Sequence, residues 1–329
     1  MAVDARVGST QEVRKRNFHR IALTNLQHDT IPDFDLFILT GKNAQPILYR
    51  TRGVPIEPYM LDRLMQHDVQ GIFVEAKDTT AYYHYVEKNL RNLLSDENMS
   101  LPEKSEAMYG TAVNLMKEAF GDPRAHNVIE RSENLVQTTL DCLMNDQTVL
   151  RELLKVASFD YYTYTHSVNV FTFSVALAKR LNLCEGPQLT EFAMGALLHD
   201  IGKYKIPPTI LNARGKLSAA EWEIMRRHPL FGHEVLRDCG MRSILSLDIV
   251  RHHHEKLSGS GYPDGLKADE IRPLVRVCTI CDVFDALTTK RPYKSAVQSF
   301  PALKIMKEEM AGEIDSHYFA EFVAMMGSA

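Results

Sequence analysis

Residues 252–266 read HHHEKLSGSGYPDGL, so three histidines and a glutamate stand directly before a turn with three glycines and a proline. Imidazole and carboxylate groups bind divalent metals and move protons, which makes this stretch the first candidate for chemistry. Successive residues of a helix point about 100° apart, so three consecutive histidines cannot all face one site. We therefore expect at most two of them to act together, at a helix end where the backbone turns.

In the segment ALLHDIGK, residues 196–203, His199 and Asp200 follow directly after the apolar residues Ala-Leu-Leu. Gly202 comes two residues later and is a natural helix stop. A carboxylate after such a segment is costly to bury unless it is paired or binds a metal. Upstream, His166 shares the inward face of a helix with apolar residues at helical spacing. A lone histidine on such a face is more often part of a packed core, so His166 is a candidate ligand only in combination with the others.

Two more segments contribute groups of the same kind. His228 stands just before Pro229, and we expect the helix that starts with the capping box of Ser218 and Glu221 to end there. Asp282 lies within the apolar helical segment CDVFDAL. Two histidines of the run bring the candidate positions to seven. This mixed set suits iron, manganese or zinc, and it is too large for one tetrahedral zinc, so it favours two metals that share a bridging carboxylate.

The composition restricts the class of protein. With 329 residues the chain exceeds one typical domain, which indicates two. A formal net charge of −4 argues against a protein that coats nucleic-acid polymers, although an acidic chain can bind a small anion locally. No apolar segment resembles a signal peptide or approaches the roughly 18 residues of a membrane span, which predicts a cytoplasmic protein. Five cysteines are too scattered for a disulfide framework, and Cys278 and Cys281 are interpreted as packing residues of a buried helix.

The spacing of apolar residues predicts a small α/β domain over residues 1–100 and a helical region over residues 101–329. DLFILTG and QPILYRTRG read as strands of a hairpin, GIFVEA as a third strand, and EPYMLDRLMQHD and TTAYYHYVEKNLRNLL as helices. The polar segment SDENMSLPEKS marks the boundary. No strand is expected after it, and the expected helices lie near 103–120, 126–145, 147–157, 161–182, 188–200, 218–227, 229–238, 241–254, 272–289 and 299–311.

The motifs ALLHDIGK, RRHP, HHE followed by GSGYPDGL, and DVFDALTTKRPYK resemble, in order and spacing, the HD-GYP family of the HD phosphohydrolase superfamily. The resemblance covers residues 125–329. With the domain division, it implies an α+β two-domain chain, a small N-terminal α/β domain followed by an all-α HD-type helical bundle. Family members hydrolyse the bacterial second messenger cyclic di-GMP to pGpG and often to GMP, by a metal-bridged hydroxide. We therefore expect such an enzyme, with cyclic di-GMP as its ligand and a homodimer as a reasonable assembly.

The resemblance also implies which residues hold two divalent metal ions. Asp200 would bridge the two metals and, with Lys203, would be catalytic. Glu255 would orient a ligand histidine, while His252 would point elsewhere. Family ligands of the first metal match His166, His199, Asp200 and Asp282, and those of the second match His228, His253 and His254.

The resemblance places three basic side chains beside the substrate phosphate: Lys203, Arg291 and Lys294. Tyr262 either lines the substrate cleft or only shapes the loop. The chain departs from the family pattern at two places. Tyr162 stands where family members with a third metal carry a glutamate, so we expect two metals, iron or manganese. Leu257 and Ser258 replace the usual Trp-Asp before GSGYP, which puts loop geometry and substrate preference in question.

Three other functions remain open. The first is a phosphodiesterase of a different cyclic dinucleotide, because the motifs do not contact the base. The second is a catalytically weak receptor for cyclic di-GMP. The third is a helical module without metal, which would bury many unligated polar groups at high cost. Residues 1–100, which resemble a domain found before some HD-GYP domains, would regulate the enzyme, dock a protein partner, mediate dimerisation or only pack on the bundle.

Overall fold

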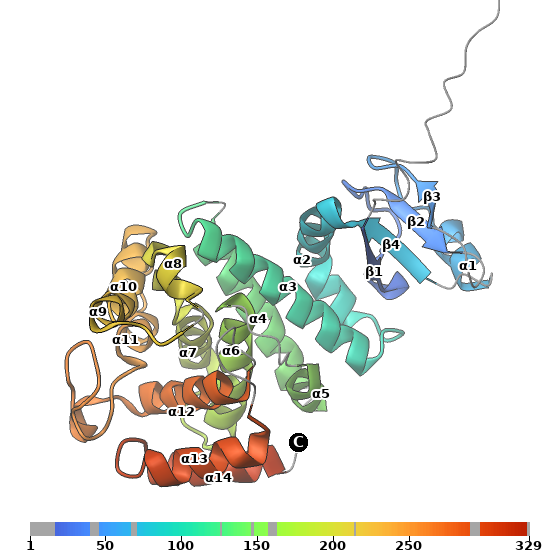
Figure 1. Cartoon of the computed structure of the whole chain (residues 1–329). Helices are drawn as coiled ribbons and strands as arrows, with labels where there is room; N and C mark the ends of the chain where they lie inside the picture. Colours follow the sequence, from blue (N-terminus) through green and yellow to red (C-terminus); the bar gives the residue numbers. More distant parts are fainter. Residues whose placement is uncertain are drawn as a thin grey trace, which may run out of the picture. The chain divides into compact units, whose positions relative to one another are not determined.

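The computed structural model describes residues 17–39, 46–66, 71–125, 127–145, 148–156, 163–213, 215–289 and 297–327. The chain divides into two compact units, Met1–Ala107 and Met108–Ala329. Helix α3, Leu101–Gly121, begins in the first unit and ends in the second (Figure 1). None of the described helices is long and apolar enough to cross a membrane.

The described part of the first unit is an antiparallel sheet with two helices. Its strands are β1 (Phe18–Ile21), β2 (Leu36–Leu39), β3 (Ile47–Arg50) and β4 (Gly71–Glu75), in the order β1-β4-β2-β3. Its helices are α1 (Pro58–Gln66) and α2 (Thr79–Ser95). The predicted hairpin, third strand and both helices are confirmed. Strand β1 was not predicted, because three of its four residues are not fully buried and its strand signal in the sequence is weak.

The described part of the second unit is helical apart from one isolated bridge between Ser258 and Lys267. The predicted helical bundle is confirmed, and two helices are additional: α8, which has only four residues, and the C-terminal α14. The helices after α3 are α4 (Val128–Asn145), α5 (Thr148–Val156), α6 (Thr163–Arg180), α7 (Gly186–Leu198), α8 (Pro208–Leu211), α9 (Ala219–Met225), α10 (His228–Asp238), α11 (Ile244–His252), α12 (Pro273–Thr288), α13 (Ser299–Glu309) and α14 (Ser316–Gly327).

Helix α6 is the centre of this bundle, because every residue from Thr165 to Ala178 is buried. It packs against α7 and α12, and α7 in turn packs against α11. In Figure 1 these four helices lie together in the second unit. A polar side chain of α6 between Thr165 and Ala178 therefore has no access to water and must find its partners inside the bundle.

Two local predictions were wrong, at His228 and at Gly202. His228 is the first residue of α10 rather than the end of α9, because Pro229 fits the first helical turn, where its missing N–H costs nothing. Gly202 does not stop a helix; α7 ends at Leu198, and Gly202 lies in the 3₁₀ turn Ile201–Lys205. A Cβ there would lie 1.9 Å from the carbonyl oxygen of His228, so glycine lets this turn approach α10 closely.

Candidate metal centre

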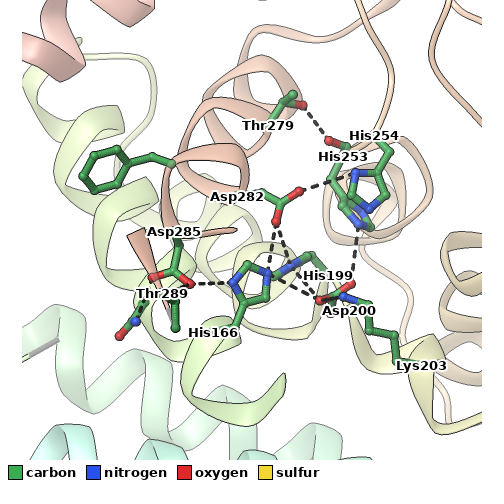
Figure 2. A network of polar contacts seen from close by, with 12 residues as sticks. His166, His199, Asp200, Lys203, His253, His254, Thr279, Asp282, Asp285 and Thr289 are labelled. Carbon is green, nitrogen blue, oxygen red and sulfur yellow. Dashed lines mark hydrogen bonds and ion pairs between the residues drawn. The ribbon is translucent and has the colours of Figure 1, made fainter. Parts of the chain in front are cut away.

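The seven predicted metal ligands converge in the second unit from helices α6, α10 and α12 and from the turns that follow α7 and α11, and Figure 2 shows most of them around Asp200. Six of them form two compact groups that share Asp200, and within each group one potential ligand atom per residue lies within 4.8 Å of the others. A single cation can contact all members at that spacing. The groups are His166, His199 and Asp200, and Asp200, His228, His253 and His254.

The carboxylate of Asp200 faces both groups with different oxygens. Its Oδ1 lies 3.1 Å from Nε2 of His228 and 3.8 Å from Nε2 of His253. Its Oδ2 lies 3.5 Å from Nε2 of both His166 and His199. One carboxylate with its two oxygens turned to two nitrogen clusters has the arrangement of a bridging ligand.

The seventh residue, Asp282, also reaches both groups. Its Oδ1 lies 3.0 Å from Nε2 of His166 and 4.0 Å from Nε2 of His199. Its Oδ2 lies 3.4 Å from Nδ1 of His254 in the other group. The resemblance had assigned this residue to one metal only, whereas its carboxylate lies beside ligands of both groups.

The backbone determines which nitrogen of three histidines carries the proton. Nδ1 of His199, His228 and His253 lies 2.9, 2.8 and 3.0 Å from the carbonyl oxygen three residues earlier. A carbonyl oxygen only accepts, so each Nδ1 must carry a hydrogen and donate it. In the neutral imidazole the lone pair then lies on Nε2. All three lone pairs consequently point into the cluster.

These lone pairs have no hydrogen to meet in the described structure. Nε2 of His228 lies 3.3 Å from Nε2 of His253, so two acceptors face each other. Nε2 of His199 is buried and makes no hydrogen bond to any described residue. Buried acceptors in such proximity are unfavourable unless a cation lies between them. The donor set therefore fits divalent metal ions, which bind neutral imidazole and carboxylate groups.

A buried carboxylate holds His166 from the side opposite the cluster. Nδ1 of His166 lies 2.6 Å from Oδ2 of Asp285, and Figure 2 shows the imidazole between Asp285 and Asp282. Asp285 is also hydrogen-bonded by Asn169 and Thr289, at 2.8 and 3.1 Å. Sequence reasoning gave Asp285 no role. Its signal was a second acid three residues after Asp282 in an otherwise apolar helix, where it must face the same interior.

The electrostatic environment favours the protonation states that metals require. Burial lowers the pKa of His228, His253 and His254, which favours neutral imidazoles. Burial alone would raise the pKa of Asp200, but the ammonium group of Lys203 holds that pKa well below its usual range. Ionised carboxylates and neutral imidazoles are the ligand forms of divalent metals, so no proton needs to leave before binding.

The histidine run divides as predicted. Helix α11 ends at His252, and the backbone turns so that His253 and His254 face the cluster. His252 faces away, with Nδ1 2.7 Å from Oδ1 of Asp248 and Nε2 2.8 Å from Oδ2 of Asp264. Both of its nitrogens contact carboxylates, and these contacts raise its pKa although burial opposes them. His252 is therefore part of an ion-paired network outside the metal cluster.

Glu255 makes different contacts from those expected. Its Oε1 accepts hydrogen bonds from the backbone N–H groups of Asp264 and Gly265, at 2.7 and 3.0 Å, and its Oε2 accepts one from Leu266 at 3.1 Å. None of these described hydrogen bonds reaches a ligand histidine. A Cβ at Gly261 would lie 2.5 Å from the Cα of Glu255, so the loop crosses directly over this residue. Glu255 thus anchors the loop, and Asp285 has the orienting position that was expected of Glu255.

The predicted substrate-side residues are only partly described. The ammonium group of Lys203 contacts Oδ2 of Asp200. The ring of Tyr262 lies 4.7 Å from that of His254, with the guanidinium carbon of Arg226 4.8 Å from the Tyr262 ring centre. Tyr262 therefore borders the metal cluster at His254, whose side chain is 23% exposed. Tyr162, Arg291 and Lys294 lie outside the described residues.

Comparison with known proteins gives matches at three levels. Residues 148–317 match a family model described as HD domain. The cyclic di-GMP phosphodiesterase PA4108 of Pseudomonas aeruginosa is 39% identical over 210 residues, 63% of this chain and 50% of that protein. The 3'3'-cGAMP-specific phosphodiesterase 3 of Vibrio cholerae is 37% identical over 159 residues, 48% of this chain and 34% of that protein. The chain thus spans half or less of the length of these relatives.

A solved structure matches nearly the whole chain. Bd1817, an HDG"Y"P protein from Bdellovibrio bacteriovorus, aligns with a TM-score of 0.65 and 21% identity, and the alignment covers 94% of this chain and 100% of Bd1817. At this identity the likeness establishes the fold. Together with the family model it confirms the resemblance drawn from the sequence motifs.

Proposed function

Because the chain belongs to the HD domain family, we propose that it is a metal-dependent phosphodiesterase that hydrolyses cyclic di-GMP to pGpG, GMP or both. The observation that carries this proposal is the set of inward-facing Nε2 lone pairs around the shared carboxylate of Asp200. Relatives named cyclic di-GMP phosphodiesterases from Pseudomonas, Xanthomonas and Thermotoga support the substrate.

The site is proposed to hold two metals, iron or manganese, because its ligands are imidazoles and carboxylates rather than thiolates. Bound divalent cations would polarise a phosphate oxygen and lower the pKa of a water molecule that they share. Asp200 would bridge the pair, as its two oxygens face the two groups. The proposed ligands are His166, His199, Asp200 and Asp282 on one side, and His228, His253 and His254 on the other.

The chain's own residues would prepare the reaction. Asp285 would keep the proton of His166 on Nδ1, so that Nε2 stays a ligand. Lys203 would offset negative charge that develops on the phosphate, since its ammonium group already lies at the shared carboxylate. Tyr262, at the edge of His254, would contact the substrate. Arg291 and Lys294 are proposed to contribute further positive charge beside the phosphate.

A different cyclic dinucleotide is the second candidate substrate. Three relatives from Vibrio cholerae, 36–39% identical over their aligned segments, are named 3'3'-cGAMP-specific phosphodiesterases. Leu257 and Ser258, where the family pattern has Trp-Asp, lie at the start of the loop that carries Tyr262. A change at this point of the loop would alter the contacts between the loop and the bases of a cyclic dinucleotide.

Metal analysis and turnover on one sample test the proposal. Protein purified without added metal is analysed by mass spectrometry and then assayed with cyclic di-GMP and 3'3'-cGAMP. Two equivalents of iron or manganese with faster turnover of cyclic di-GMP is the expected result. Faster turnover of 3'3'-cGAMP would select the second substrate. Bound metals and tight binding of cyclic di-GMP without hydrolysis would indicate a receptor. A protein that is isolated without metal and does not hydrolyse either dinucleotide after metal is added back would overturn the proposal of an enzyme.

The first compact unit is proposed to regulate the enzyme or to dock a protein partner. Its link to the second unit is the continuous helix α3, which supports a role in control. A homodimer is the proposed assembly.

A further inference from the structure

A chain of buried polar side chains leads from helix α3 to the metal cluster. The hydroxyl of Tyr109 donates to Oδ1 of Asn169 at 2.8 Å, and Nδ2 of Asn169 donates to Oδ1 of Asp285 at 2.8 Å. Oδ2 of Asp285 lies 2.6 Å from Nδ1 of His166. The four side chains come from α3, α6 and α12, and each is at most 9% exposed. The chain is thus closed to water along its length.

We propose that Tyr109 is a positioning residue for the metal ligand His166 and acts through Asn169 and Asp285. The inference rests on the proposed metal function of the cluster. It adds a residue that lies 57 positions before His166 and belongs to none of the sequence motifs.

The chemistry of the amide explains why a tyrosine is needed. An asparagine side chain has an accepting oxygen and a donating nitrogen of nearly the same shape, so it can sit in two orientations. The carboxylate of Asp285 only accepts, so it turns the amide nitrogen of Asn169 toward itself and the amide oxygen toward Tyr109, whose hydroxyl donates to that oxygen. Without this hydroxyl the amide oxygen loses a buried hydrogen bond, which weakens the hold on the amide that supports Asp285.

The orientation of Asn169 matters for His166 because Asp285 is held at both oxygens. Asn169 binds Oδ1, and Thr289 and His166 share Oδ2. This arrangement keeps Asp285 in place and leaves Nε2 of His166 aimed at Asp200 and Asp282. Loss of one donor loosens the carboxylate and therefore the imidazole. Residues that hydrogen-bond a metal ligand from behind commonly change metal affinity by about 10–100-fold when they are replaced.

The position of Tyr109 also connects the metal centre to the helix that the two units share. Helix α3 begins in the first unit, and Tyr109 lies near the start of its part in the second. A shift or rotation of α3 would move the hydroxyl that orients Asn169. The hydrogen-bonded series from Tyr109 through Asn169 and Asp285 to His166, called the relay below, therefore makes metal binding sensitive to the position and rotation of α3.

The test is the Mn²⁺ affinity of the whole 329-residue chain after a chelator has removed its metals, measured by competition with a coloured chelator. Tyr109→Phe removes only the hydroxyl, and we expect affinity at one of the two sites to fall about tenfold, the lower end of the range for such residues. Tyr85→Phe is the matched control, since it removes a part-buried hydroxyl that bonds Gln27 and Thr30 in the first unit. It should leave Mn²⁺ affinity unchanged.

A structural role is separated from positioning by the melting temperature of the metal-free protein. If Tyr109→Phe lowers this temperature but keeps wild-type Mn²⁺ affinity, the relay is wrong. Asn169→Ala and the double variant provide a second criterion, because residues of one relay are not additive. The double variant should lose no more affinity than Asn169→Ala alone, and additive losses would contradict the relay. Mn²⁺ binding needs no substrate, so a failure of the cyclic di-GMP proposal would leave this result interpretable.

Discussion

Each unit of the chain contains a buried cluster of polar side chains, and the two clusters follow opposite rules. In the first unit, Nδ2 of Asn25 donates to Tyr82 at 2.6 Å, and the backbone N–H of Gln27 donates to Tyr85 at 2.8 Å. Each of these contacts pairs a donor with an acceptor. In the second unit, Nε2 of His228 and Nε2 of His253 face each other at 3.3 Å as two acceptors.

The difference distinguishes buried polarity that stabilises a fold from buried polarity that binds a ligand. Matched pairs lose little on burial, because protein hydrogen bonds replace those to water. Several buried acceptors that face one another lose their water and repel each other, so their burial indicates a partner that supplies positive charge. The tyrosine cluster of the first unit, Asn25, Gln27, Thr30, Tyr82 and Tyr85, leaves Oδ1 of Asn25 without a hydrogen bond to a described residue, but its tyrosine hydroxyls meet donors. In the histidine cluster, acceptors meet acceptors.

Removal of the carboxylate that both groups share, that of Asp200, should have the largest effect on the histidine cluster. Asp200→Ala deletes the ligand common to both groups, and we expect metal affinity to fall by more than about 100-fold, beyond the loss typical of supporting residues. Hydrolysis should fall with it. Metal content by mass spectrometry after gel filtration measures the loss, with His252→Ala as control, because His252 bonds Asp248 and Asp264 instead of the cluster. Full metal content in Asp200→Ala would refute the bridging role.

Replacing Lys203 tests whether its ammonium group takes part in catalysis or only balances the negative charge of Asp200. Lys203→Met removes the ammonium group from Asp200, and the pKa of this carboxyl should rise, because Lys203 helps to lower it. We expect metals to be retained while kcat for cyclic di-GMP falls about 100-fold, typical for loss of one group that stabilises developing charge. An unchanged kcat with altered metal affinity would assign Lys203 to charge compensation alone. Lys205→Met, in the same turn but paired with Glu234, is the control.

Metal removal should affect the histidine cluster and leave the tyrosine cluster unchanged, so both responses can be measured in one molecule. A metal present at 100 times its dissociation constant stabilises the folded state by about 2.7 kcal/mol per site. For a unit of this size with two occupied sites, chelation should therefore lower the melting temperature by about 10–20 °C. Hydrogen exchange should accelerate in α6 and α12 but not in α2, which carries Tyr82 and Tyr85. Equal acceleration in α2 would show that the tyrosine cluster also depends on an ion.

The sequence named the residues that the structure brings together better than it predicted the surrounding backbone. His253 and His254 were named from the motif of the resembling family, and Asp282 was noticed as a costly acid in an apolar segment. The start of α10 at His228 was missed, since a proline is compatible both with the end of one helix and with the first turn of the next. Helical spacing predicted that at most two histidines of the run act together, the resemblance implied His253 and His254, and the structure turns these two toward the cluster.

Supporting residues were harder to predict because their partners are distant in sequence. Asp285 contacts a histidine 119 residues away, and Tyr109 contacts an asparagine 60 residues away. Neither contact has a local pattern. Glu255 was assigned to a ligand histidine because it follows the histidine run directly. Its carboxylate turns to the loop instead, where it accepts hydrogen bonds from three backbone N–H groups.

Glu255→Gln tests this reassignment and should have the smallest effect of the series. The amide nitrogen of glutamine would face backbone donors, so at least one N–H of Asp264, Gly265 or Leu266 would lose its acceptor, at a cost of about 1–3 kcal/mol. The loop also carries Tyr262, whose ring borders His254. We therefore expect KM for cyclic di-GMP to rise several-fold with metal affinity unchanged. A fall in metal affinity instead would restore the original assignment, in which Glu255 orients a ligand histidine. Comparison with Asp285→Asn, which should lower metal affinity, gives each outcome an internal reference.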